Sequence, residues 1–239
     1  MRLQDFSTGM DTLLNSYAVS ARFGSTDNPG TIELDEYEKS QLLTKSQEDT
    51  VIDLYSGRNP IGASFEQTEE LRRYLANLVK EAKLSPIETT AGILGIDSKS
   101  KFFTLPEDLW FITYESVSIT DGKCEGHTSL EVIPVRQDEY HRIKKNPFRG
   151  ANGRRALRLD LSDGVIEIVS KYAVSEYYLR YLRKIKPIIL TDLGSENSIR
   201  GISSATECEL PESLHQMILE RAVAAALQSR GYNTRNENN

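Results

Sequence analysis

The segment RRALRLDLSDGVIEIVSKY, residues 154–172, decides the fold class of this chain. Its two arms, 154–161 and 165–172, carry the alternating and β-branched apolar residues of strands that bury a face. The Ser-Asp-Gly sequence at 162–164 is typical of a tight turn, because glycine tolerates the positive φ that short hairpins need. We therefore predict an antiparallel hairpin here, and a sheet around it.

Further strands are expected on both sides of this hairpin. Period-two segments occur at 101–105, 109–120 and 128–135, and a tyrosine-rich strand follows the hairpin and ends near Pro187. Pro134 favours an edge strand or a bulge, because proline cannot donate a backbone hydrogen bond. QDEYHRIKK, residues 137–145, predicts a short helical turn that stops before Asn146-Pro147.

The first third of the chain has helical periodicity. A first amphipathic helix is indicated by the spacing of Phe6, Met10, Leu13, Leu14 and Tyr17. Asp35 and Glu38 form a capping box for a helix that runs to about Tyr55, with Gly57 as its left-handed stop. SFEQ, 64–67, reads as a second capping box. The apolar residues behind it, from Leu71 to Ala82, predict a second helix antiparallel to the first.

A further helix closes the chain. Pro211 stands at its start, where a missing N–H costs nothing, and Gly231 ends it. Its buried stripe is expected to be Leu214, Met217, Ile218, Ala222, Ala225 and Ala226. The predicted class is α+β: an N-terminal helical hairpin, an antiparallel β-sheet core and a C-terminal docking helix. We expect the segments 1–99, 100–207 and 208–239 to form one integrated domain, with a flexible tail.

Composition is that of an ordinary soluble protein: 239 residues, 38% hydrophobic and 27% charged, with a formal net charge of −6. The N-terminus lacks the apolar core of a secretory signal, and no apolar run approaches about 18 residues. Two cysteines make no disulfide framework. We expect a protein that folds inside a cell and has no membrane partner.

Charge is distributed unevenly along the chain. Residues 141–160 carry seven Arg and Lys against one Asp, whereas residues 30–70 carry ten Asp and Glu against three Lys and Arg. The candidate basic surface comprises Arg142, Lys144, Lys145, Arg149, Arg154, Arg155 and Arg158. The candidate complementary acidic surface comprises Glu33, Asp35, Glu36, Glu38, Glu48 and Asp49. The basic segment can be a solvated loop, a DNA-contacting rim, or a surface that meets the acidic region of a neighbouring copy.

Catalytic motifs are lacking. The sequence has no phosphate-binding GxxxxGK[ST] or GxGxxG, no GxSxG elbow and no HExxH, and Cys124 and His127 have no further ligand nearby. Acid pairs such as Asp49 and Asp53 are common on solvated helix faces. We therefore predict no enzyme, no metal and no cofactor. Tyr177 to Lys184 mixes aromatic and basic residues, so the alternative is an intracellular nucleic-acid-binding protein that uses residues 141–186.

Three stretches of the second half carry a resemblance: LEVIPVRQDEYHRIKKNPFRG, VIEIVSKYAVSEYYLRYLRKIKPIIL and CELPESLHQMILERAVAAAL. With them the chain, over roughly 105–230, resembles virion structural proteins of tailed bacteriophages, especially the head–tail connector adaptor and ring proteins of crAss-like phages. The resemblance implies a ring, usually of twelve copies, that stacks beneath the portal protein and continues the DNA channel. It implies no enzyme activity and no cofactor.

The implied partners are copies of the chain itself, the portal protein, neighbouring connector or tail proteins and, transiently, genomic DNA. The implied location is the virion at the head–tail junction or tail, after synthesis in the host bacterial cytoplasm. We expect the basic surface to face a neighbouring subunit. Contact with DNA is the second choice, because strong phosphate binding would oppose passage of DNA through a channel.

Overall fold

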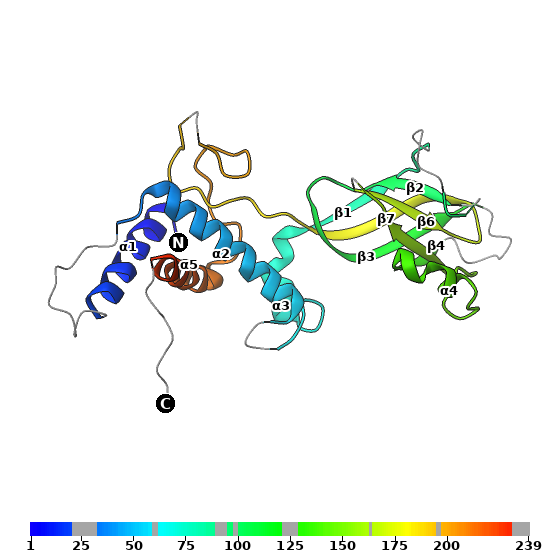
Figure 1. Cartoon of the computed structure of the whole chain (residues 1–239), viewed down its shortest axis with the longest axis horizontal. Coiled ribbons are helices and arrows are strands. Elements are labelled where there is room, and N and C mark those ends of the chain that lie inside the picture. Colours follow the sequence, from blue (N-terminus) through cyan, green and yellow to red (C-terminus); the bar gives the residue numbers. More distant parts are fainter. Residues whose placement is uncertain are drawn as a thin grey trace. The chain divides into compact units, whose positions relative to one another are not determined.

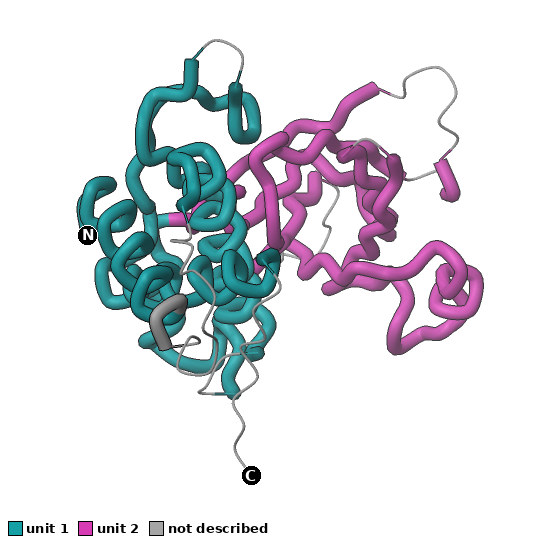
Figure 2. Tube along the Cα trace, turned by 60° about the vertical axis from the view of Figure 1, so that its left-hand side comes forward, with its two compact units in different colours: residues 1–77, 185–239 teal, residues 78–184 magenta. Residues whose placement is uncertain are grey.

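The chain folds into two compact units. The computed structural model describes residues 1–20 (the side chains of 18–20 excepted), 33–58, 62–88, 95–97, 100–120, 129–162, 164–194 and 197–230. Unit 1 comprises residues 1–77 and 185–239, and unit 2 comprises residues 78–184, so unit 2 is inserted into unit 1 (Figure 2). Unit 1 thus joins most of the expected segment 1–99 to the expected C-terminal segment, and unit 2 contains most of 100–207.

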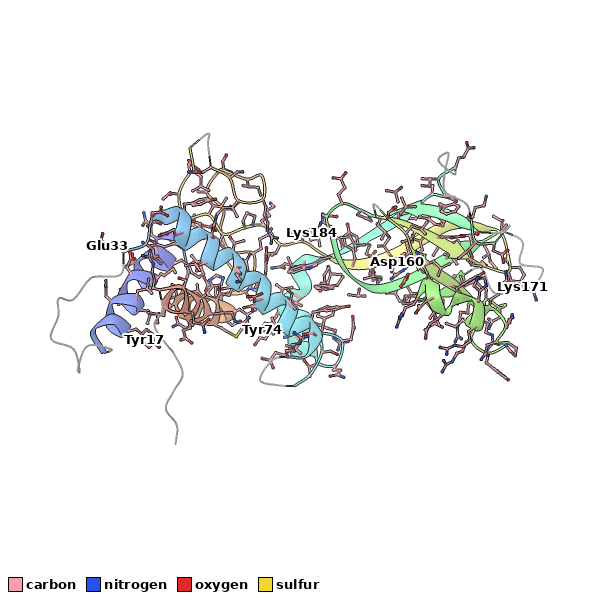
Figure 3. The ribbon with its side chains drawn as sticks, in the orientation of Figure 1. Tyr17, Glu33, Tyr74, Asp160, Lys171 and Lys184 are labelled. Atoms are coloured by element: carbon pink, nitrogen blue, oxygen red, sulfur yellow. The ribbon has the colours of Figure 1, made fainter. Side chains whose placement is uncertain are left out.

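Unit 1 is helical. Its helices are α1 (Leu3–Ser20), α2 (Glu36–Ser56), α3 (Glu69–Leu75) and α5 (His215–Ser229), the last preceded by a 3₁₀ turn η3 (Glu212–Leu214) (Figure 1). α5 contacts both α1 and α2, and its fully buried residues include Ile218, Ala222 and Ala226. The predicted terminal helices therefore form and pack together. Tyr17, expected in the buried stripe of α1, is instead exposed (Figure 3).

The predicted capping of α2 is confirmed. Asp35 accepts a hydrogen bond from the Glu38 backbone N–H at 2.6 Å, and Glu38 accepts one from the Asp35 backbone N–H at 3.3 Å. At the other end Gly57 adopts a φ of 83°, which a residue with a Cβ rarely does. The end of α5 predicted at Gly231 lies outside the described residues.

The second half of the predicted helical hairpin is wrong. Thr68, not Ser64, caps α3, which ends at Leu75; a 3₁₀ turn η1 (Ala76–Leu78) and strand β1 (Val79–Leu84) follow. All six residues of β1 pair with β7, from Val79 opposite Leu182 onward. The inter-strand hydrogen bonds thus override the helical spacing of the apolar residues.

Polar residues buried on α2 bind an extended segment of the same unit. The Ser40 hydroxyl accepts the backbone N–H of Leu190 at 3.0 Å, and the Thr44 hydroxyl accepts that of Ile188 at 3.1 Å. Gln47 donates to the Lys186 carbonyl oxygen at 2.8 Å. These bonds satisfy backbone groups that would otherwise be buried without partners, which explains polar side chains inside a helical core.

A buried ammonium group joins α1 to α2. Lys39 of α2, with a side chain only 5% exposed, places Nζ 2.8 Å from Asp11 of α1 and 2.9 Å from Glu36. Burial alone would lower the pKa of Lys39, but the hydrogen bonds that its ammonium donates to Asp11 and Glu36 outweigh this effect and raise that pKa. The lysine therefore stays charged and links the two helices.

Unit 2 is a curled seven-stranded sheet in the order β1-β7-β3-β4-β5-β6-β2 (Figure 1). Besides β1, the strands are β2 (Lys101–Thr104), β3 (Leu109–Ile119), β4 (Ser129–Pro134), β5 (Arg155–Asp160), β6 (Val165–Val169) and β7 (Val174–Arg183). The α+β class and the β5–β6 hairpin are confirmed. The sheet is mixed, not wholly antiparallel, because β4 and β5 run parallel. β3 pairs with β4 only as far as Glu131, so Pro134 has a partner strand, β5, on one side only. On the other side no inter-strand hydrogen bond is lost through the missing N–H of the proline.

Candidate assembly surface

The basic segment forms the crossover between the parallel strands β4 and β5. Parallel neighbours need such a crossover, which here contains the 3₁₀ turn η2 (Gln137–Glu139) and helix α4 (Tyr140–Lys144). Tyr140 is fully buried against Leu157, Leu159 and Val169. The tyrosine thus fixes the crossover on the outer face of the sheet, as Figure 1 shows for α4.

Five of the seven candidate basic residues lie on the exposed crossover. Arg142 pairs with Glu139 at 2.7 Å and Lys144 pairs with Asp97 at 2.8 Å. Lys145, Arg149 and Arg154 are exposed and form no ion pair with the residues that the structure describes. These three side chains carry the charge that is available to a partner.

The other two candidates serve the fold. The Arg155 guanidinium donates to the backbone carbonyl of Phe148 at 2.8 Å and so holds the crossover. Arg158, with a side chain 11% exposed, lies 2.6 Å from Glu115 of β3 and 2.9 Å from Asp160. The structure therefore does not bring Arg158 to the surface, since its side chain points inward from β5.

Glu115 is held by the phenol of Tyr177 as well as by Arg158. The Tyr177 hydroxyl donates to Glu115 at 2.8 Å. Burial raises the pKa of the Glu115 carboxyl, although Arg158 opposes the rise, and burial together with Glu115 raises the pKa of Tyr177. All three groups have partners among themselves, so the cluster stabilises the sheet rather than presenting a reactive group.

The candidate acidic residues do not form one uniform face. Glu36 pairs with Lys39, Glu48 pairs with Arg200, and Glu38 completes its capping box and lies 3.6 Å from Arg230. Asp35 caps α2, Glu33 is exposed and Asp49 is half-buried. The charge asymmetry nevertheless follows the units. Unit 1 has 20 Asp and Glu against 12 Lys and Arg, and unit 2 has 15 against 17.

Comparison with known proteins covers both units at once. The model of the family described as phage tail ring protein 3/4 matches residues 1–238. The chain belongs to this ring protein family. Its members are structural proteins of bacteriophages, which confirms the resemblance inferred from the second half of the sequence.

Two relatives of this ring-family chain come from one virus. Ring protein 3 of Bacteroides phage crAss001 is 48% identical over 240 residues, which cover 99% of this chain and 100% of the relative. Ring protein 4/5 of the same phage is 30% identical over 235 residues, covering 95% and 92%. The similarity therefore includes the inserted sheet unit as well as the helical unit.

Reactive groups are sparse in the described part of this ring-family chain. Cys124 and His127 lie outside the described residues. The described residues contain no group of three or more His, Cys, Asp or Glu side chains that could hold a metal ion. Asp108 is held by Lys80 at 2.6 Å and by the Tyr181 hydroxyl at 2.9 Å. No helix of the described ranges is both long and apolar enough to span a membrane.

One residue of the crossover was missed by sequence reasoning. Phe148 is 84% exposed at the tip of the ring-family chain's basic crossover. Its signal in the sequence was the Asn-Pro that precedes it, a dipeptide that starts turns, within a run of basic residues. The Phe148 ring therefore lies outside the core of its own unit.

Proposed function

We propose that this chain is a non-enzymatic subunit of a ring in the phage tail, where it assembles with copies of itself. The whole-chain match to the tail ring protein family carries this proposal. Both relatives are named as ring proteins, and the similarity extends over nearly their full lengths. In the finer form of the proposal the ring has twelve copies, lies below the portal protein and continues the channel for the genome.

The distribution of charge supports a contact between copies. The helical unit is strongly acidic and the crossover of the sheet unit presents Lys145, Arg149 and Arg154. Because the crossover and the helical unit are different surfaces of the chain, contact between them is head-to-tail, and such contacts close into a ring when the rotation per subunit allows it. A solvated loop would need no such complementarity.

The crossover is less suited to gripping nucleic acid. Arg142, Lys144 and Arg158, within the segment 141–186, are already paired with acids, and Arg180 is paired with Glu81. Binding to nucleic acid depends on unpaired Lys and Arg side chains, which neutralise phosphates and so release the counterions of the DNA. We therefore favour protein contacts for the crossover, with DNA contact transient and unspecific.

Quantitative mass spectrometry of purified particles tests the proposal. The copy number of this chain is measured against that of the portal protein in the same particles. A ratio near one, or a small whole multiple, is expected for a ring stacked on the portal. Absence of the chain from the particles would overturn the proposal, and a non-integral trace amount would do the same.

A further inference from the structure

Phe148 is held outward by a rigid turn. Asn146 Oδ1 accepts hydrogen bonds from the backbone N–H groups of Phe148 at 2.9 Å and Arg149 at 3.2 Å. The Gly150 N–H donates to the Asn146 carbonyl at 2.8 Å, and Arg155 holds the Phe148 carbonyl. The phenyl group therefore needs little further ordering to enter a partner, and preorganisation of this kind favours binding.

The surroundings of Phe148 resemble the centre of a protein interface. Aromatic residues and arginines are enriched at interface centres, where an apolar anchor is enclosed by polar groups. Lys145 and Arg149 are close to Phe148 in the chain, and both are exposed. A phenyl group can stack on bases only where the nucleic acid is single-stranded. A projecting phenyl group flanked by Lys145 and Arg149 fits a concave protein surface of acidic character.

Unit 1 of the same chain offers such a surface. An open groove of about 550 Å³ lies between α1 and α5, lined among others by Asp5, Thr8, Gly9, Leu13 and Leu219. Its walls include these leucines, and its charged groups are the Asp5 carboxylate and the N-terminal ammonium of Met1, which lies 3.5 Å from Glu212. The unit as a whole carries a formal charge of −8, from 20 acidic and 12 basic residues. The groove therefore has apolar leucine walls, belongs to a unit of net negative charge and is large enough for a phenyl group.

We propose that Phe148 of one copy inserts into the α1–α5 groove of the neighbouring copy, with Lys145 and Arg149 against its acidic helical unit. The inference rests on the proposed ring function and names the contact that builds the ring. Knob and groove are different surfaces of one chain, so each subunit uses its knob on one neighbour and its groove on the other.

Photo-crosslinking in assembled particles tests this contact. Phage particles are prepared in which a photoreactive diazirine analogue of phenylalanine occupies position 148. After irradiation we expect a product of twice the mass of the chain on a denaturing gel, whose linked peptide comes from residues 3–20 or 215–229. A link to another site, to another virion protein, to DNA or within one copy would overturn the proposal, and so would no link. Particles that lack the chain would refute the ring function instead.

Competition between variants gives a second readout. When Phe148→Ala and the unaltered chain are made together, we expect the variant to be depleted from particles about 30-fold or more, as for an anchor at an interface centre. Thr12→Trp, which fills the groove from an exposed position of α1, should be depleted likewise.

Matched controls separate this effect from misfolding. Tyr114→Ala removes another exposed aromatic residue of unit 2, and Gln41→Trp adds an indole to an exposed position of α2. Both should enter particles as the unaltered chain does. Equal incorporation of Phe148→Ala and Tyr114→Ala would contradict the proposal.

Discussion

Arg158 and Glu115 form an ion pair inside the sheet of unit 2, with 2.6 Å between Nη1 and Oε1 and side chains 11% and 10% exposed. The pair joins β5 to β3 although β4 lies between these two strands in the sheet. Arg158 thus stabilises the curl of the sheet across three strands and is not part of the exposed crossover.

Removing Arg158 should destabilise the chain strongly. Arg158→Ala leaves the Glu115 carboxylate buried without its counter-ion, which typically costs about 3–5 kcal/mol. Arg154→Ala, at the exposed position directly before β5, should lower the free energy of unfolding by less than about 0.5 kcal/mol. Urea unfolding followed by circular dichroism measures both. Equal stabilities of the two variants would show that the pair contributes nothing.

Two glycines of the crossover should respond differently to alanine. A Cβ on Gly150 would lie 2.9 Å from the Asn146 carbonyl oxygen, closer than such atoms approach, so the turn that presents Phe148 must open. A Cβ on Gly153 would meet Tyr172 at an ordinary 3.5 Å. Hydrogen exchange should therefore accelerate at the Phe148 and Arg149 amides in Gly150→Ala and stay unchanged in Gly153→Ala. Unchanged exchange in Gly150→Ala would mean that the turn tolerates the methyl group.

Asp108 should make unit 2 sensitive to acid. Its hydrogen bond from Lys80 lowers the pKa of the carboxyl below the ordinary 3.8, aided by the Tyr181 hydroxyl and opposed by burial. A folded-state pKa below the unfolded one means that this stabilisation is present above pH 3.8 and is lost as the pH falls through the folded pKa.

Unfolding at two pH values tests that linkage. The free energy of unfolding of the unaltered chain should exceed that of Asp108→Asn at pH 7, and the gap should narrow at pH 3. Asp138→Asn, in an exposed pair with Arg136, serves as the control and should show a smaller gap at pH 7. A gap for Asp108→Asn that stays constant between the two pH values would contradict the assignment.

The elements predicted correctly are those with strong local signals. The capping box at Asp35 and Glu38 and the hairpin of β5 and β6 each depend on residues a few positions apart. The helix predicted from the periodicity between Leu71 and Ala82 is wrong at its second half. There β1 pairs with β7, about a hundred residues further along the chain, and such a distant pairing leaves no local signal.

The surface assignment failed at Arg158 for a related reason. In β5 the leucines Leu157 and Leu159 face the crossover, so alternation alone puts Arg158 on the solvent side. The structure buries both faces of this strand, because Tyr140 covers one and the curled sheet encloses the other. Only the two-sided cover distinguishes a buried arginine from an exposed one. Conversely, the exposure of Phe148 follows from the turn at Asn146, which hydrophobicity alone does not reveal.

The insertion of unit 2 has a consequence for how such proteins change over evolution. The chain leaves and re-enters unit 1 next to Val79 and Leu182, which face each other in the β1–β7 ladder. Neighbouring strands are about 4.8 Å apart, so the sheet unit begins and ends almost at the same point. A segment with adjoining ends can be exchanged as a cassette without rerouting its host. Two viruses could therefore keep the same helical ring subunit and swap only the module that carries the Phe148 knob.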